Sequence, residues 1–139
     1  MRSALLLFAM LPLGACDTID GCGNTVASRL LSPDGKHAAI LFERNCGATT
    51  GFSTQVSIVA ANASPGGKGN TYIANGGSTP APWGGPWARI RWLGPNRLEI
   101  SYDPTSRIAL QESQVAGVSI DWRTAPPPIN NSAQGSHPL

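Results

Sequence analysis

Three cysteines, two histidines and one run of hydroxyl side chains are the residues in this 139-residue sequence that could do chemistry. The cysteines are Cys16, Cys22 and Cys46. A structural zinc site needs cysteine or histidine ligands at short spacing, and neither His37 nor His137 has such spacing to a cysteine. The sequence also has no glycine-rich nucleotide loop of the GxxxxGK[ST] type. We therefore expect no metal site and no other cofactor.

The hydroxyl-rich segment, residues 47–54 (GATTGFST), is a candidate binding loop. Its backbone amides and hydroxyls could line a site for a small polar ligand, and we count Thr49, Thr50, Phe52 and Ser53 as candidates. The competing interpretation is a connection between strands whose hydroxyls satisfy backbone groups. A nucleophile at Ser53 or Thr50 would need a positioned base, which neither histidine is placed to supply. We therefore expect a protein that is not an enzyme.

Three more side chains are candidates for binding. Arg44 follows Glu43, but neighbours on a strand point to opposite faces and usually act separately. Trp83 and Trp87 lie in the glycine- and proline-rich stretch PWGGPW. Their indoles could stack on sugar rings or contact a partner protein, or they could cover an open end of a small core.

These candidates must be positioned by β-strands, because the chain contains 16 glycines and 12 prolines, which long helices do not tolerate. Apolar and polar residues alternate with the period of two that is typical of half-buried antiparallel strands. We expect an all-β fold, a single small antiparallel sheet, sandwich or meander with strands at residues 25–31, 36–44, 54–60, 71–74, 89–92, 97–102 and 118–123.

Other segments are less regular. Both faces of residues 36–44 carry apolar side chains, so this strand should be central. Residues 105–116 could form a strand or one short helix. Residues 62–70 and 75–86 read as loops, and residues 125–139, which begin with three prolines, read as a disordered tail. The ordered domain should therefore span residues 20–124.

The first residues have the pattern of an export signal. One positive charge at Arg2 precedes an apolar run, residues 4–15, which as a helix would span only about 18 Å, too short for a bilayer core of about 30 Å. The tetrapeptide that ends at Cys16, Leu-Gly-Ala-Cys, resembles the lipobox of bacterial lipoproteins. The resemblance implies a signal peptide at residues 1–15 and diacylation of Cys16. The alternative is an ordinary secreted protein cleaved near Ala15.

A lipobox implies a compartment and a first partner. Lipidated Cys16 and a short tether, residues 16–20, would attach the domain to a lipid bilayer in the cell envelope, facing the periplasm or the exterior. In enterobacteria, an aspartate in the position of Asp17 usually retains lipoproteins at the inner membrane. We expect no nucleic-acid partner, because the formal net charge is only +2 and the sequence has no basic stretch.

The lipobox also accounts for the odd number of cysteines. If Cys16 carries the lipid, Cys22 and Cys46 remain as a pair in an oxidising compartment, and we predict a disulfide between them. In the chain-entropy model, closing a loop of about 25 residues stabilises the fold by about 3.5 kcal/mol. The alternative is two reduced, buried thiols.

A longer resemblance covers residues 22–58. The string SPDGKHAAILFERNCGATTGFSTQVSI is similar to the defining segment of a family of small, uncharacterised bacterial proteins, many of them envelope lipoproteins. This resemblance implies a fold unit and a compartment, but it assigns no catalytic residue.

Taken together, these features predict a membrane-anchored envelope lipoprotein with a non-enzymatic binding or structural role, and an envelope protein or glycan as its partner. The alternative is an inhibitor of a lysozyme-like or other envelope hydrolase, in which residues 47–54 would be the contact. An enzyme with Ser53 or Thr50 as nucleophile is a third class of function.

Overall fold

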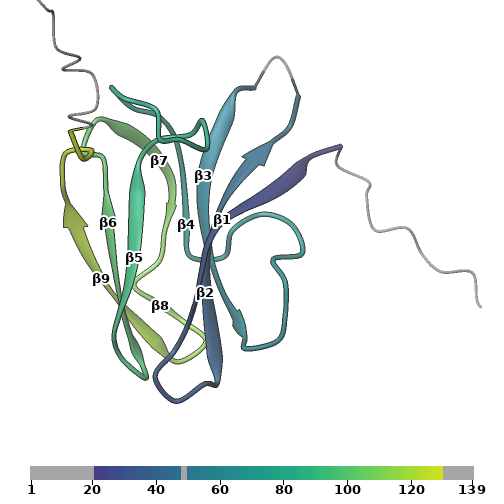
Figure 1. Ribbon diagram of the computed structural model, residues 1–139, viewed down its shortest axis with the longest axis vertical. Helices are drawn as coiled ribbons and strands as arrows, with labels where there is room; N and C mark the ends of the chain where they lie inside the picture. Colours follow the sequence, from purple (N-terminus) through teal and green to yellow (C-terminus); the bar gives the residue numbers. More distant parts are fainter. Residues whose placement is uncertain (1–20, 48–49, 130–139) are drawn as a thin grey trace, which may run out of the picture.

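Alternating side chains build two β-sheets in the computed structural model, which describes residues 21–47 and 50–129. The first sheet has the strand order β1-β2-β3-β4-β7 and the second β5-β6-β9-β8 (Figure 1). The described residues contain no helix, so the all-β prediction is confirmed. The strands are β1 (Gly23–Leu31), β2 (His37–Asn45), β3 (Phe52–Ala60), β4 (Tyr72–Gly76), β5 (Ala88–Gly94), β6 (Arg97–Tyr102), β7 (Ser106–Gln111), β8 (Gln114–Val115) and β9 (Val118–Thr124).

The two sheets pack face to face on one main core. Every second residue of the central strands points into it, and burial of these apolar side chains stabilises the sandwich. Tyr72 of the first sheet lies against Tyr102 and Trp122 of the second, with ring centroids 5.8 Å and 5.6 Å apart. The buried residues of the main core are Ala39, Leu41, Val56, Ile58, Tyr72, Ala74, Ala88, Ile90, Leu98, Ile100, Val118 and Ile120.

Strand β2 is buried on both faces, as its sequence predicts. Its Ala39 and Leu41 face the main core, whereas Ala38, Ile40 and Phe42 form a second apolar cluster on the outer face of the first sheet. The connection from β3 to β4, residues 61–71, is hydrogen-bonded to side chains of this outer face. The central position of β2, between β1 and β3, is therefore confirmed.

The expectation of wholly antiparallel pairing is wrong for one pair of strands. β6 and β9 run parallel, in a register that places Ile100 opposite Trp122. The chain leaves the second sheet after β6, runs through β7 in the first sheet, and returns to form β8 and β9. This passage through the other sheet supplies the long crossover that parallel neighbours need.

Smaller differences concern boundaries. The segment 105–116, for which a strand and a short helix were both considered, forms β7 and β8. β4 continues to Gly76, two residues into the segment predicted as a loop. β9 ends at Thr124. The expected signal peptide, Cys16, Asp17 and residues 130–139 of the predicted tail lie outside the described residues.

Strand ends from both sheets meet at one end of the sandwich, which we call the loop end. It comprises residues 45–47, 50–52, 76–87 and 103–105, and the described chain begins beside it at Gly21 (Figure 1). The turns that join β1 to β2 and β5 to β6 lie at the opposite end. The loop end therefore brings most of the sequence candidates into one region.

Candidate functional site

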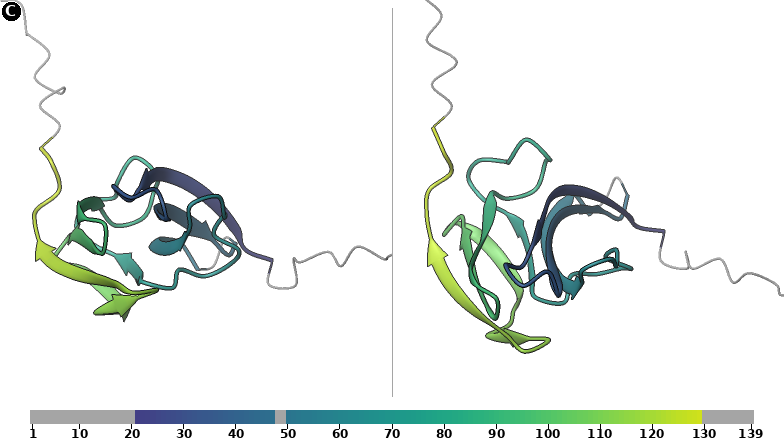
Figure 2. Two further views of the ribbon diagram at one scale, coloured as in Figure 1. Left: turned by 90° about the horizontal axis from the view of Figure 1, so that it is seen from below. Right: turned by 60° about the horizontal axis from the view of Figure 1, so that its bottom comes forward.

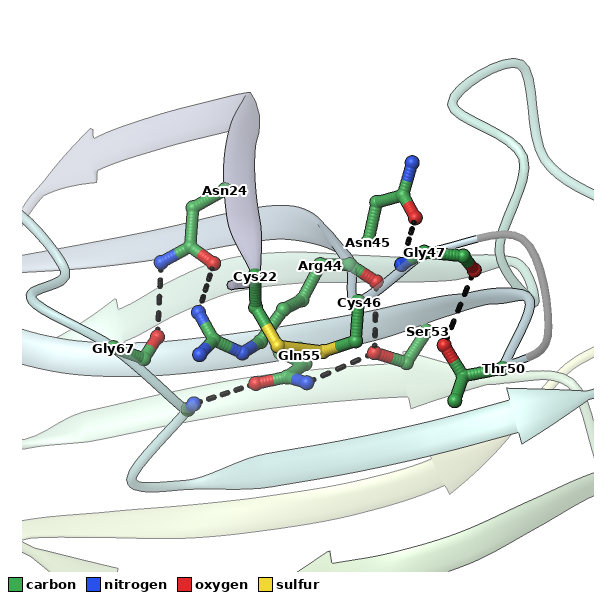
Figure 3. The surroundings of a disulfide bond; sticks show 11 residues. Cys22, Asn24, Arg44, Asn45, Cys46, Gly47, Thr50, Ser53, Gln55 and Gly67 are labelled. Carbon is green, nitrogen blue, oxygen red and sulfur yellow. Dashed lines mark hydrogen bonds between the residues drawn. A yellow bond between two sulfur atoms is a disulfide. The ribbon is translucent and has the colours of Figure 1, made fainter. Parts of the chain in front are cut away.

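A disulfide joins the first and second strands at the loop end. Cys22 and Cys46 are bonded with an S–S distance of 2.08 Å, and they directly continue the Gly23–Asn45 pair of the β1–β2 ladder. The predicted pairing is confirmed, and the alternative of two reduced thiols is wrong. The bond holds the point at which the described chain begins against the base of the hydroxyl-rich loop (Figure 3).

Arg44 is buried beside this disulfide, with only 4% of its surface exposed. Its Nη1 donates a hydrogen bond of 2.6 Å to Oδ1 of Asn24, and Nδ2 of Asn24 donates to the carbonyl of Gly67 at 2.9 Å (Figure 3). Glu43 points to the other face of the sheet, as neighbours on a strand do. Arg44 thus connects two strands to the β3–β4 connection, and its contacts are structural.

Ser53 and Gln55 form a second polar link to that connection. Nε2 of Gln55 donates to the hydroxyl of Ser53 at 2.9 Å, and that hydroxyl donates to the carbonyl of Arg44 at 3.3 Å. Oε1 of Gln55 accepts the amide hydrogen of Gly69 at 2.6 Å. Because a side chain at Gly69 would come within 2.8–2.9 Å of two backbone carbonyls, glycine is required for this close approach.

The remaining hydroxyls of the loop bond mainly to the protein itself. Thr50 is exposed, and its hydroxyl donates to the carbonyl of Gly47 at 3.3 Å. Thr54 is fully buried; its hydroxyl donates to the carbonyl of Pro86 at 2.5 Å and accepts the indole hydrogen of Trp83 at 2.9 Å. Thr49 lies outside the described residues.

The candidate nucleophiles have no catalytic base beside them in the described residues. The hydrogen-bond partners of Ser53 and Thr50 are backbone carbonyls and an amide side chain, not an imidazole or a carboxylate. His37 stands at the first residue of β2, at the opposite end of the strand from the loop end. The described residues also contain no cluster of acidic, histidine or cysteine side chains that could hold a metal ion.

The two tryptophan candidates lie in the loop that precedes β5. Trp83 is half-buried and packs against the main core, where its hydrogen bond to Thr54 fixes the indole. Trp87 is also half-buried, and its carbonyl accepts the amide hydrogen of Asp103 at 3.1 Å. The ring of Trp83 therefore helps to close the loop end of the sandwich, while the backbone of Trp87 is tied to the β6–β7 turn.

A buried carboxylate supports the same end from the opposite side. Oδ1 of Asp103 accepts hydrogen bonds from the amide and the hydroxyl of Thr105 at 2.8 and 2.7 Å. Burial alone would raise the pKa of Asp103, but the hydrogen bonds from Thr105 and from the backbone of Ser78 together outweigh it and lower the pKa. A side chain at Gly77 would meet Oδ2 of Asp103 at 3.0 Å, so the chain passes closely over this carboxylate.

A groove of about 330 Å³ opens at the surface of the loop end, and Thr50 and Phe52 contribute to its lining. Phe52 is 46% exposed, and its ring lies against Gly84, where a side chain would clash at 2.9 Å. Arg107 of β7 forms part of the lining, and its Nε donates to Oδ1 of Asn75 at 3.3 Å. A second hollow, of about 480 Å³, also includes Phe52 and extends towards Gly21 and Asn45.

The structure thus brings some candidates together and separates others. Thr50 and Phe52 share the groove with Gly84, which lies in the loop that carries Trp83 and Trp87 and that we call the tryptophan loop. Arg44 and Ser53 instead face the β3–β4 connection. Sequence reasoning missed Arg107 and Asn75, because their role depends on the pairing of β4 with β7. Only their polar character in short strands could have suggested them.

Comparisons with known protein families, curated proteins and solved structures gave no match for this chain. No helix among the described residues is long and apolar enough to cross a membrane.

Proposed function

We propose that this protein is a bacterial envelope lipoprotein, attached to a membrane through a lipid on Cys16. The observation that carries the proposal is the disulfide between Cys22 and Cys46. Such bonds persist in oxidising compartments, and the cysteine left over is the one that ends the lipobox-like tetrapeptide. Two acyl chains would hold the domain at the bilayer without a spanning segment.

Mass spectrometry of the protein isolated from bacterial membranes tests the anchor. We expect a chain that begins at Cys16 and carries the added mass of acyl groups. The matched variant Cys16→Ser should leave the membrane fraction and keep the Cys22–Cys46 bond, because that pairing does not involve position 16. A native product that keeps residues 1–15 and lacks acyl mass would overturn the proposal.

We further propose that the domain binds an envelope component through its loop end and is not an enzyme. The groove between Phe52 and Arg107 supports binding, since it offers an exposed aromatic ring beside a guanidinium. Aromatic rings stack on the faces of sugars, and guanidinium groups pair with carboxylates. Both features suit an acidic envelope glycan better than an apolar ligand.

Nuclear magnetic resonance titration of the protein with soluble peptidoglycan fragments tests this binding. We expect shifts at Phe52, Gly76 and Arg107, and at least a tenfold weaker affinity for Phe52→Ala. Leu93→Ala is the matched control, because Leu93 is similarly exposed, at 42%, but lies at the opposite end of the sandwich. Shifts that are absent, or equally weakened by both variants, would contradict binding of these glycans at the loop end.

A hydrolase inhibitor is the second candidate, because the exposed Phe52 and Thr50 lie in a loop braced by the disulfide. A rigid loop loses little entropy when it enters an active site. In lysozyme lysis assays, the protein should slow lysis, and the double variant Thr49→Ala/Thr50→Ala should relieve the effect. Lysis rates that are unchanged by the unaltered protein would exclude this function.

A further inference from the structure

Four arginines gather on the outer face of the second sheet, although the sequence has no basic stretch. They are Arg89 and Arg91 of β5, Arg97 of β6 and Arg123 of β9, and they alternate along their strands with residues of the main core. The face contains two acidic residues, Glu99 and Asp121. It therefore carries a net charge of +2, equal to the formal net charge of the whole chain.

Glu99 organises the centre of this arginine face. It is 3% exposed, and its Oε1 and Oε2 accept from Arg91 at 3.1 Å and from Arg123 at 2.7 Å. Asp121 is paired with Arg97 at 2.9 Å. The ion pairs hold the guanidinium groups in place, while the side chains of Arg91 and Arg123 remain 62% and 69% exposed.

One row of the face, formed by Arg89, Ser101 and Arg123 on three neighbouring strands, contains no acidic residue. Strand pairing places Arg89 and Arg123 on either side of Ser101, which is itself buried. Within the described part of the chain, the side chain of Arg89 is exposed and makes no hydrogen bond or ion pair. With an interstrand spacing of about 4.8 Å, the two arginines stand about 10 Å apart across β6. Arg123 is paired with Glu99, whereas Arg89 offers a guanidinium group that no acid of the face pairs with.

From these observations we propose that the arginine face docks an extended, acidic polypeptide segment of a partner protein. Arg89 and Arg91 are alternate residues of β5, so the rows of arginines that cross the strands at these positions lie about 6.8 Å apart. Alternate side chains of an extended chain have the same spacing. An acidic residue at every second position would meet successive rows and pair with them bidentately.

The place where the described chain begins, at Gly21, favours a protein partner over the bilayer. Both views of the ribbon place the start of β1 and the outer, β9 side of the second sheet on opposite sides of the molecule (Figures 1 and 2). Residues 16–20 could span only about 17 Å. If Cys16 is lipidated, this tether joins the domain on the side away from the arginine face. The docking proposal itself does not require lipidation.

Fluorescence anisotropy with a labelled peptide of five Glu-Ser repeats tests the proposal on the purified protein. We expect Arg89→Gln to weaken binding about threefold and Arg89→Gln/Arg123→Gln more than tenfold. The charge-matched control, Lys36→Gln/Lys68→Gln, removes two exposed lysines elsewhere and should change the affinity less than threefold. Equal weakening by both double variants would show that binding follows net charge alone, which would overturn the proposal.

Two further arms make the test independent of misfolding. Asp121→Asn removes a negative charge that is paired with Arg97 alone and leaves Glu99 to hold Arg91 and Arg123. It should strengthen peptide binding a few-fold, a gain that a damaged fold would not give. A peptide with five consecutive glutamates followed by five serines has the same charge but another spacing, and should bind more weakly. Tighter, arginine-dependent binding to vesicles with 30% phosphatidylglycerol than to the peptide would assign the face to a lipid surface and overturn the proposal.

Discussion

At the scale of residues, the loop end depends on a few buried polar side chains that join distant segments. Thr54 is the clearest case, because its hydroxyl bonds both to the carbonyl of Pro86 and to the indole of Trp83. Buried donors and acceptors that lose their partner cost about 1–3 kcal/mol each. A single hydroxyl thus holds the tryptophan loop against β3.

The substitution Thr54→Val tests this role with little change of shape. It should lower the free energy of unfolding by about 2–4 kcal/mol, since the buried carbonyl of Pro86 and the half-buried indole of Trp83 both lose their partner. The measurement is urea unfolding followed by tryptophan fluorescence. Thr50→Val is the control; Thr50 is exposed, and we expect a change below about 0.5 kcal/mol. Equal effects of the two substitutions would contradict the assignment.

At the scale of elements, β1 is a strand with little apolar packing, because none of its residues belongs to either apolar cluster. It lies at the edge of the first sheet, and Val26 and Leu31 are 52% and 57% exposed. Its register also shifts between Val26 and Ser28. The hydrogen bonds to β2 and the disulfide at Cys22, just before its first residue, therefore contribute much of the stability of β1 in the sheet.

Removal of the disulfide should loosen β1 before the rest of the domain. In the Cys16→Ser background, Cys22→Ala/Cys46→Ala should lose about 3.5 kcal/mol of stability, because the loop that the bond closes is 24 residues long in sequence separation. Hydrogen exchange should accelerate most in β1, and least in β6 at the centre of the second sheet. Uniform acceleration in all strands would show that the bond acts only on the unfolded chain.

At the scale of the whole molecule, Tyr72 links the two sheets and makes stability depend on pH. Burial in the main core raises the pKa of Tyr72 to about 12 from its usual value near 10. The folded protein therefore keeps the phenol protonated at a pH where the unfolded chain has already lost the proton. The resulting stability is present below pH 10 and is lost as the pH rises towards 12.

Urea unfolding between pH 8 and pH 11.5 measures this dependence. We expect a loss that approaches about 2 kcal/mol near the upper limit. Tyr72→Phe should remove that part of the slope, since the phenol makes only a 3.5 Å contact with Ser106. The same slope in both proteins would show that other groups cause the loss.

The sequence by itself determined the features that depend on neighbouring residues. Alternation of apolar and polar side chains predicted the strands, because successive side chains in a strand point to opposite faces. The turn Ser32-Pro33-Asp34-Gly35 formed as its residues require: Gly35 has a φ of +71° and donates to the carbonyl of Ser32 at 2.9 Å. Assignment of Cys16 to the lipobox-like tetrapeptide left Cys22 and Cys46 as the remaining pair, and the disulfide between them is confirmed.

Only the tertiary structure decided which segments become neighbours. The parallel pairing of β6 with β9 depends on the passage of β7 through the other sheet, and no local pattern encodes that route. The same pairing brings Arg123 beside Glu99 and Ser101, so arginines scattered along the sequence form one face. Likewise, Arg44 is buried because residues 61–71 pack over its strand. Side-chain periodicity acts within a strand, whereas pairing between strands is settled by the packing of the whole chain.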